Sequence, residues 1–340
     1  MLRGPAAALL AALWGGWAAP ALAQEGNARA EAIAKTSPSA RASLAFIESQ
    51  ARQIKDPPLR AAVRALLSSP APSFMVRYPD AASRAAAHQA LAAAGFIDPA
   101  KVTADALFPP LPPLSFLAAP GGGTGGHHSY PGGLAEHTAF NLQTALDLEA
   151  NYRTRYGLKD LDHDLVVAAP ILHDLMKPWC LQWRADGTEL DQPTIAGTAS
   201  HHIFILAELI HRGLSPELIS AVAAAHEPAH LGEEKVAGFL RAAALLAGAD
   251  PVQRGLVAAG GKTLARPPSI EGAIDHLSDH DYIVTEPIEQ AVLAALETPD
   301  RWQALEIQAR IPAMKIYAAL RARGVPGVRQ LVRGAAPRPQ

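Results

Sequence analysis

Histidine and aspartate side chains recur through the middle of this sequence in a pattern that suits metal binding. Each lies in or beside a segment with helical periodicity, so each could be carried by a different helix. In a helical bundle, side chains from facing helices can converge on a shared centre. The residues concerned are His137, the doublet His173-Asp174, His202, His226 and Asp250. We expect these six side chains to meet in one pocket.

The residue types fit a borderline divalent metal such as Mn, Fe, Zn, Ni or Co, because imidazole nitrogens and carboxylate oxygens bind these ions well. The single cysteine, Cys180, excludes a thiolate-rich zinc site. We expect one or two ions, and with two the Asp174 carboxylate can bridge them. Two ions can activate a water and stabilise a phosphoryl oxygen. Lys177, one turn beyond Asp174, could neutralise phosphate charge.

The motifs around these residues resemble those of the HD superfamily of metal-dependent phosphohydrolases. The segment HHSYPGGLAEHT (127–138) is similar to the first motif, especially in the branch that includes 3′–5′ exoribonucleases. ILHDLMK is similar to the H-D-x-x-K motif, HIFILAE (202–208) to the third-helix segment, AAHE to the fourth histidine motif and LLAGAD to the final aspartate motif. The resemblance covers roughly residues 127–255.

The resemblance implies an all-α fold, an HD-domain helical bundle, and it assigns roles residue by residue. The core metal ligands it implies are His137, His173, Asp174 and Asp250. The ligands it implies for a second ion are His202 and His226. Asp174 and Lys177 would take part in catalysis, since Lys177 matches the lysine near the substrate phosphate. Two departures matter: Ala225 precedes His226 where many relatives have a second histidine, and the Gly-Tyr-Pro stretch of the cyclic-di-GMP-degrading branch is missing. A third ion and that substrate are therefore not expected.

Several residues have rivals nearby. His201 could replace His202, although the apolar stripe of the same helix favours His202. His127 and His128 could line the pocket or be exposed in their glycine loop. Asp275 is a rival to Asp250, but the small-residue context favours Asp250. The acids and histidines of 275–282 are more typical of a solvated helix end than of a second metal site.

Composition shifts predict five segments. A signal peptide occupies 1–23, an N-terminal helical region 24–107, a Pro/Gly-rich linker 108–126, the metal-dependent hydrolase domain 127–255, and a C-terminal helical extension with a frayed tail 256–340. The linker glycines could instead let the backbone approach a ligand. Within the hydrolase domain, Gly213 is expected to end one helix and Ser215-Pro216 to begin the next.

The N-terminus has the pattern of a secretory signal. Arg3 precedes an apolar run over 6–19, and Ala21-Leu22-Ala23 is a small-x-small cleavage site. The run is shorter than the roughly 20 residues of a membrane anchor, and no later segment is expected to cross a membrane. We therefore expect export, to the bacterial periplasm.

Charge and motifs together define the expected function. The net charge of −2 gives no basic footprint for nucleic acid. We expect a metal-dependent phosphohydrolase that cleaves a phosphomonoester or phosphodiester in a small phosphorylated substrate. Two alternatives stay open: a di-iron oxygenase with the same ligands, and a non-catalytic module that binds a metal or ligand. The sequence predicts no oligomeric state.

Overall fold

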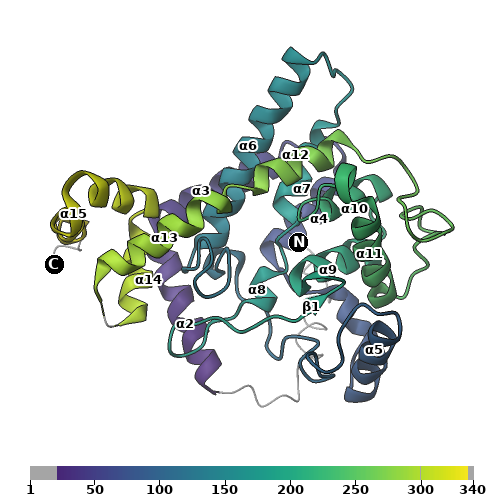
Figure 1. The fold of residues 1–340 in the computed structure, drawn as a ribbon, viewed down its shortest axis with the longest axis horizontal. Helices are drawn as coiled ribbons and strands as arrows, with labels where there is room; N and C mark the ends of the chain where they lie inside the picture. Colours follow the sequence, from purple (N-terminus) through teal and green to yellow (C-terminus); the bar gives the residue numbers. More distant parts are fainter. Residues whose placement is uncertain (1–20, 299, 336–340) are drawn as a thin grey trace, which may run out of the picture.

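The structure, a computed structural model, describes residues 21–298 and 300–335, and the regular secondary structure of these residues is helical apart from one two-stranded sheet (Figure 1). The all-α prediction is confirmed. The elements before the site are α2 (Ala21–Thr36), α3 (Pro38–Ala51), α4 (Pro57–Ser68), the 3-10 helix η1 (Ser73–Arg77), α5 (Ala81–Ala93) and the 3-10 helix η2 (Phe116–Ala118). Those around it are α6 (Gly133–Arg155), α7 (His163–Leu172), α8 (Lys177–Cys180), β1 (Thr194–Ile195), β2 (Thr198–Ala199), α9 (Ser200–His211), α10 (Pro216–Ala223), α11 (Ala229–Ala247) and α12 (Ile270–Asp279). The last are α13 (Tyr282–Leu296), α14 (Arg301–Arg310) and α15 (Ala313–Ala335).

A bundle of six helices forms the centre of the fold. α6 and α7 pack on each other and on α12, α9 packs along α11, and α10 contacts α7, α9 and α12. The expected helix boundaries between α9 and α10 are confirmed. Gly213 takes a left-handed φ of 73° after α9, and the Ser215 side chain accepts the Leu218 N–H with Pro216 at the first position of α10.

The N-terminal region shares the core of this bundle. α3 lies along α6, and the Phe74 ring from η1 packs against Trp179 and Phe204. The Pro/Gly-rich segment 108–126 also packs inward, since Phe108 and Phe116 are buried, so it is not a flexible linker. One hydrophobic cluster runs from Ile47 to Leu264. The division into separate domains stays a prediction.

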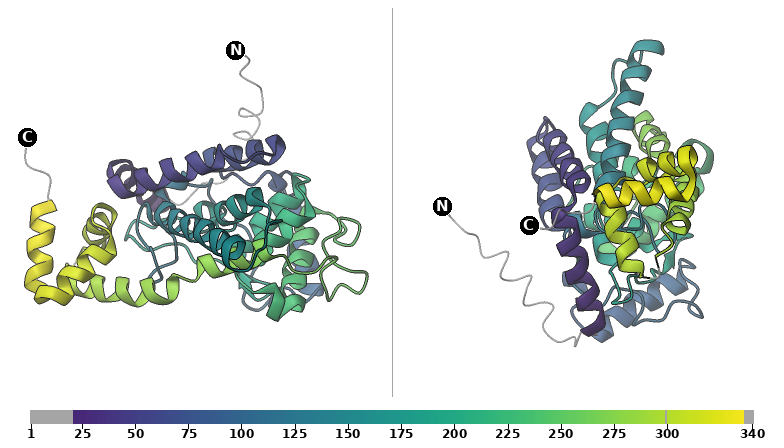
Figure 2. Two further views of the ribbon diagram at one scale, coloured as in Figure 1. Left: turned by 90° about the horizontal axis from the view of Figure 1, so that it is seen from above. Right: turned by 90° about the vertical axis from the view of Figure 1, so that its left-hand side faces the viewer.

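The C-terminal helices extend away from the bundle. α13 leads from the end of α12 to α14 and α15, which lie at one end of the molecule (Figure 2). α15 packs on α13 and α14, and α14 also contacts α2 and α3.

Two predictions concern residues that the structure largely omits. The predicted signal peptide falls almost entirely on residues 1–20 and the frayed tail includes 336–340, both outside the described residues, so export stays a prediction. Among the described helices, none combines the length and the apolar character needed to cross a bilayer.

Candidate metal centre

A tight loop before α6 places His137. Gly132 enters the helix with a φ of 96°, and the next residue, Gly133, lies so close to the loop that a Cβ there would be 1.9 Å from the His128 carbonyl oxygen. His137 follows in the second turn of α6 and is buried. Its Nε2 atom lies 3.1 Å from Asp174 Oδ2 and 3.0 Å from Asp279 Oδ1.

Asp174 lies at the centre of the site. It follows His173 directly after α7 ends, and both side chains are buried. Its two carboxylate oxygens face different neighbours. Oδ2 lies 3.3 Å from His173 Nε2, while Oδ1 lies 3.1 Å from His201 Nε2 and 3.6 Å from His226 Nε2. The structure thus brings together four of the six predicted side chains: His137, His173, Asp174 and His226.

Asp279, not Asp250, is the second carboxylate of the site. Asp250 is exposed, and its Oδ1 accepts the backbone N–H groups of Val252 and Gln253 at 2.8 and 3.0 Å, so it caps the turn after α11. Asp279, at the end of α12, lies 3.3 Å from His173 Nε2 as well as next to His137. The structure does not bring Asp250 together with the other predicted site residues.

The acids of α12 are buried, so the expectation of a solvated helix end is wrong. Asp275 and Asp279 lie one helical turn apart, on the face that carries the buried Ile274. The sequence already contained a sign of this arrangement. Residues at positions i and i+4 lie on the same face of a helix, so Asp275 and Asp279 are both buried when the face that carries Ile274 is buried. Asp275 Oδ1 lies 3.6 Å from His173 Nδ1, where a carboxylate can orient the imidazole.

His201 contacts Asp174, whereas His202 supports His226. The His201 ring lies between Asp174 and Gln192, whose Oε1 is 2.8 Å from Nδ1. His202 stacks on His226 with ring centroids 4.2 Å apart, and its Nε2 lies 3.2 Å from the Ala223 carbonyl. The structure therefore places the rival residue His201, rather than His202, beside Asp174.

This arrangement separates the effects of two neighbouring substitutions. His201→Ala removes a nitrogen that faces Asp174, so we expect loss of the ion held by that group. His202→Ala removes only a ring that positions His226, and we expect metal affinity to fall by about 10- to 100-fold. Metal titration of the two purified variants measures both effects. An equal or larger loss in His202→Ala would show that His202 is the ligand.

Burial and charge fix the protonation of the site in the structure. Burial opposes ionisation of Asp174, but Lys177 and His173 outweigh it and hold the pKa of Asp174 well below its usual range. Burial likewise lowers the pKa of His173, yet the surrounding carboxylates of Asp174, Asp279 and Asp275 raise it well above the ordinary value. Burial lowers the pKa of His201 to about 4, against the opposing effect of Asp174. A neutral His201 is ready to donate a lone pair to a cation.

The unpaired atoms of the site fit a cation. Both ring nitrogens of His173, Nε2 of His201 and both oxygens of Asp174 are buried and make no hydrogen bond of acceptable geometry with any described residue. Buried polar atoms are normally satisfied, and metal coordination is one way to satisfy them. In two groups that contain Asp174, the ligand atoms lie within 4.8 Å of one another: His137, His173, Asp174 and Asp279, and then Asp174, His201 and His226. Asp174 belongs to both.

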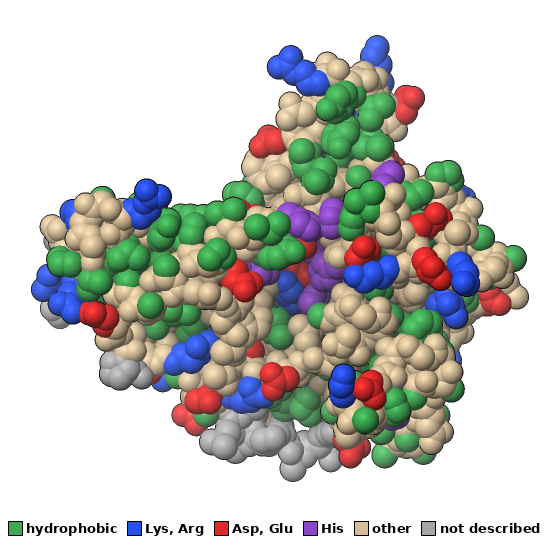
Figure 3. All heavy atoms as spheres, viewed as in Figure 1, with side chains coloured by type: hydrophobic (Ala, Val, Ile, Leu, Met, Phe, Trp, Pro, Cys, Tyr) green, Lys and Arg blue, Asp and Glu red, His purple; other side chains and the backbone are tan. Residues whose placement is uncertain are grey.

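A cavity of about 370 Å³ opens onto these groups. The space-filling view shows histidines gathered around the hollow, with a basic side chain within it (Figure 3). Its lining includes His127, Lys177, His201, His226, Asp279 and Tyr282. Lys177 is buried, and its Nζ lies 2.5 Å from Asp174 Oδ2 and donates to the Gly121 carbonyl. Gly122, Gly123 and Gly126 from segment 108–126 also line the cavity.

A buried carboxylate on α13 supports the loop that carries His127 and His128. Glu289 accepts the backbone N–H groups of His128 and Ser129, and its Oε1 lies 3.9 Å from His128 Nδ1. Burial raises the pKa of the Glu289 carboxyl from 4.5 to about 8, in spite of these hydrogen bonds. The folded protein therefore keeps this proton at a pH where the unfolded chain has lost it.

The raised pKa predicts a pH-dependent difference between the wild type and Glu289→Gln. As pH rises from about 4.5 to about 8, Glu289 ionises in the unfolded chain but stays protonated in the folded protein. The free energy of unfolding of the wild type therefore falls across this pH range, and this group causes no further loss above about pH 8. Glu289→Gln has no carboxyl group at this position, so its free energy of unfolding lacks this pH-dependent loss. Urea unfolding of both proteins across the window measures it, with Glu286→Gln, one turn earlier and partly exposed, as the control. A constant difference in free energy of unfolding would contradict the assignment.

Comparison with known proteins adds one relative. The chain is 35% identical over 107 residues to the dihydroneopterin 2′,3′-cyclic phosphate phosphodiesterase of Methanocaldococcus jannaschii. The match covers 29% of this chain and 39% of the relative, so it spans about two fifths of that protein's length. No protein-family model matches the chain, and no solved structure is detectably similar to it. The chain is therefore a distant, partial relative of a phosphodiesterase, with buried histidine and aspartate groups that could hold metal ions.

Proposed function

We propose that this protein is a metal-dependent phosphohydrolase that cleaves a phosphodiester bond in a small phosphorylated molecule. One observation carries the proposal: the two oxygens of buried Asp174 face two separate groups of ligand atoms. A carboxylate in that position can bridge two ions, and paired ions a few ångströms apart are a recurrent device for phosphoryl chemistry.

Each ion would be held by a different group of side chains, and the two groups share Asp174. The first would be held by His137, His173, Asp174 and Asp279, and the second by Asp174, His201 and His226. The mixture of imidazole and carboxylate suits Mn, Fe, Co, Ni or Zn. When bound, such ions lower the pKa of a coordinated water and stabilise negative charge on phosphate oxygens.

The chain itself supplies the surroundings for a phosphate. Lys177 is a buried cation at the wall of the cavity, and its ammonium group can donate to a phosphate oxygen. The loop residues Gly122 and Gly123 also line the cavity. A Cβ on Gly122 would lie 2.7 Å from the His127 carbonyl oxygen, so only glycine allows the loop to fold this tightly beside the site.

The size of the cavity and the relative support a small diester as substrate. About 370 Å³ accommodates a small molecule rather than a folded polymer. The name of the relative, a 2′,3′-cyclic phosphate phosphodiesterase, describes hydrolysis of a cyclic phosphodiester. We extend to this chain the bond type, a phosphodiester in a small molecule.

Metal removal tests the proposal. We expect protein stripped with a chelator to lose hydrolysis of bis(p-nitrophenyl) phosphate and of a 2′,3′-cyclic nucleotide, and Mn²⁺ to restore both. A monoester, p-nitrophenyl phosphate, serves as the comparison. Hydrolysis that persists in metal-free protein would contradict the proposal. Turnover that requires iron and O₂ would favour the oxygenase alternative, and stable metal binding with no turnover of any phosphoester would favour a binding module.

A further inference from the structure

We propose that His127, His128 and His137 form an additional cation site beside the two groups that share Asp174, suited to a borderline transition metal such as Zn²⁺, Ni²⁺ or Co²⁺. The site goes beyond the proposed hydrolase, since it can be occupied whether or not the protein cleaves phosphoesters. Three imidazoles with no carboxylate in the group are a ligand set that favours these metals over Mg²⁺ or Ca²⁺.

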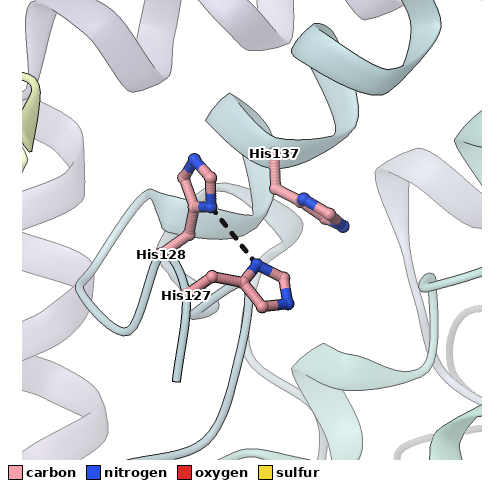
Figure 4. A group of neighbouring side chains, drawn as sticks. All are labelled: His127, His128 and His137. Atoms are coloured by element: carbon pink, nitrogen blue, oxygen red, sulfur yellow. Dashed lines mark hydrogen bonds between the residues drawn. The ribbon is translucent and has the colours of Figure 1, made fainter. Parts of the chain in front are cut away.

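The three imidazoles converge from two elements. His127 and His128 come from the glycine loop and His137 from α6, and each offers a nitrogen within 4.8 Å of those of the other two (Figure 4). The Nδ1 atoms of His127 and His128 lie 3.3 Å apart. The ring of His137 has its centroid 4.7 Å from that of His127 and 5.5 Å from that of His128.

The loop is built around a strained His128. Its φ of 53° lies in the left-handed region, which costs free energy in a residue other than glycine. Close approach by two glycines makes room for it, because a Cβ at Gly121 would lie 2.7 Å from the His128 Cβ and one at Gly133 would meet its carbonyl oxygen. Glu289 and the Gly121 N–H bind the backbone of His128 on either side. Strain held by this many contacts is typical of a functional position.

His137 presents a different nitrogen to each neighbour. Its Nε2 faces Asp174 and Asp279, and Asn141 Nδ2 lies 3.1 Å from it. Its Nδ1 is buried and has no hydrogen-bond partner among the described residues. That unpaired nitrogen is the third ligand of the proposed site.

Neighbouring charges shape the affinity. Burial, His137 and Lys177 lower the pKa of both His127 and His128, so burial and the charge of Lys177 disfavour a cation, while Asp174 favours one at His127. His127 also lines the cavity. Three protein ligands leave a coordination position open, as in catalytic zinc sites. An ion here could therefore accept an oxygen of a molecule bound in the cavity.

Cobalt binding tests the site. We expect metal-free wild type titrated with Co²⁺ to bind a single ion more per chain than His127→Ala, measured by elemental analysis and by the visible absorption of Co²⁺. His128→Asn should show the same loss, and asparagine tolerates the left-handed backbone, so this variant preserves the loop. His280→Ala is the control, because His280 lines the same cavity but lies outside the group. If wild type, His127→Ala and His128→Asn bind the same number of Co²⁺ ions per chain, the proposal is wrong. His127 and His128 would then be only a hydrogen-bonded pair.

A second background separates this site from the hydrolase. Asp174→Asn removes the carboxylate that both other groups share and should weaken them, while the three-histidine site keeps all of its ligands. Adding His127→Ala to that variant should then remove one further Co²⁺ per chain. If the double variant still binds Co²⁺ like Asp174→Asn alone, the histidine site is absent. If the site is present but wild type cleaves no phosphoester, only the proposed hydrolase fails.

Discussion

Replacing Asp174 with asparagine should lower phosphodiester hydrolysis by at least about 10³-fold, because one substitution removes a ligand from both metal groups. Asparagine has nearly the same shape, so the bundle should still fold. Asp279→Asn should also lower activity severely, since Asp279 contacts both His137 and His173. Metal content and kcat/KM of the Mn²⁺-loaded variants measure the two effects.

Asp250→Asn is the matched control for these variants. It makes the same chemical change in the aspartate that the sequence motif favoured, but at an exposed cap after α11. We expect full metal content and nearly full activity, with at most a small loss of stability from the weaker cap. If Asp250→Asn were inactive and Asp279→Asn active, the geometry of the centre described above would be wrong.

The contrast between Asp250 and Asp279 shows what local sequence can decide. Helical periodicity and the histidine motifs selected His137, His173, Asp174 and His226, four side chains that the structure brings together. Choosing the last carboxylate depends on how the chain returns after α11, and residues 248–269 form a loop that brings α12, rather than the end of α11, against α6 and α7. No local sequence pattern predicts the path of residues 248–269.

The sequence could not indicate for a different reason which of His201 and His202 lies beside Asp174. An apolar stripe identifies the inner face of a helix only when the other face meets solvent. Every residue of α9 from Ser200 to Ile210 is buried, so both histidines point into protein. Which one reaches Asp174 depends on the packing of α9 against α11 and α8, and the stripe carries no information about that.

The Pro/Gly-rich segment 108–126 misled for a third reason. Proline and glycine prevent helix formation in this segment, apart from the short η2. A segment without helix can still pack its side chains into the core. Phe108 stacks on Tyr78 and Trp179 with ring centroids 5.1 and 6.3 Å apart. The apolar residues between the prolines were the available sign that this segment is buried.

Replacing Phe74 with alanine should lower the free energy of unfolding by about 3–5 kcal/mol. The Phe74 ring is fully buried, and its centroid lies 6.4 Å from that of Phe108, 6.2 Å from Trp179 and 6.0 Å from Phe204. Removing it leaves a cavity between the N-terminal region and the helices that carry the metal centre. Urea unfolding monitored by tryptophan fluorescence and by circular dichroism measures the loss.

Val76→Ala in the same 3-10 helix is the control, because Val76 is 49% exposed and should change stability by no more than about 0.5 kcal/mol. The two optical probes also test whether residues 24–107 are a separate unit. A shared aromatic cluster means that the cavity should weaken both sides together, so the transitions of Phe74→Ala should shift in parallel and stay coincident. If the circular dichroism transition of Phe74→Ala splits while its fluorescence transition is unchanged, the N-terminal region unfolds alone. The metal centre would then not depend on the N-terminal region.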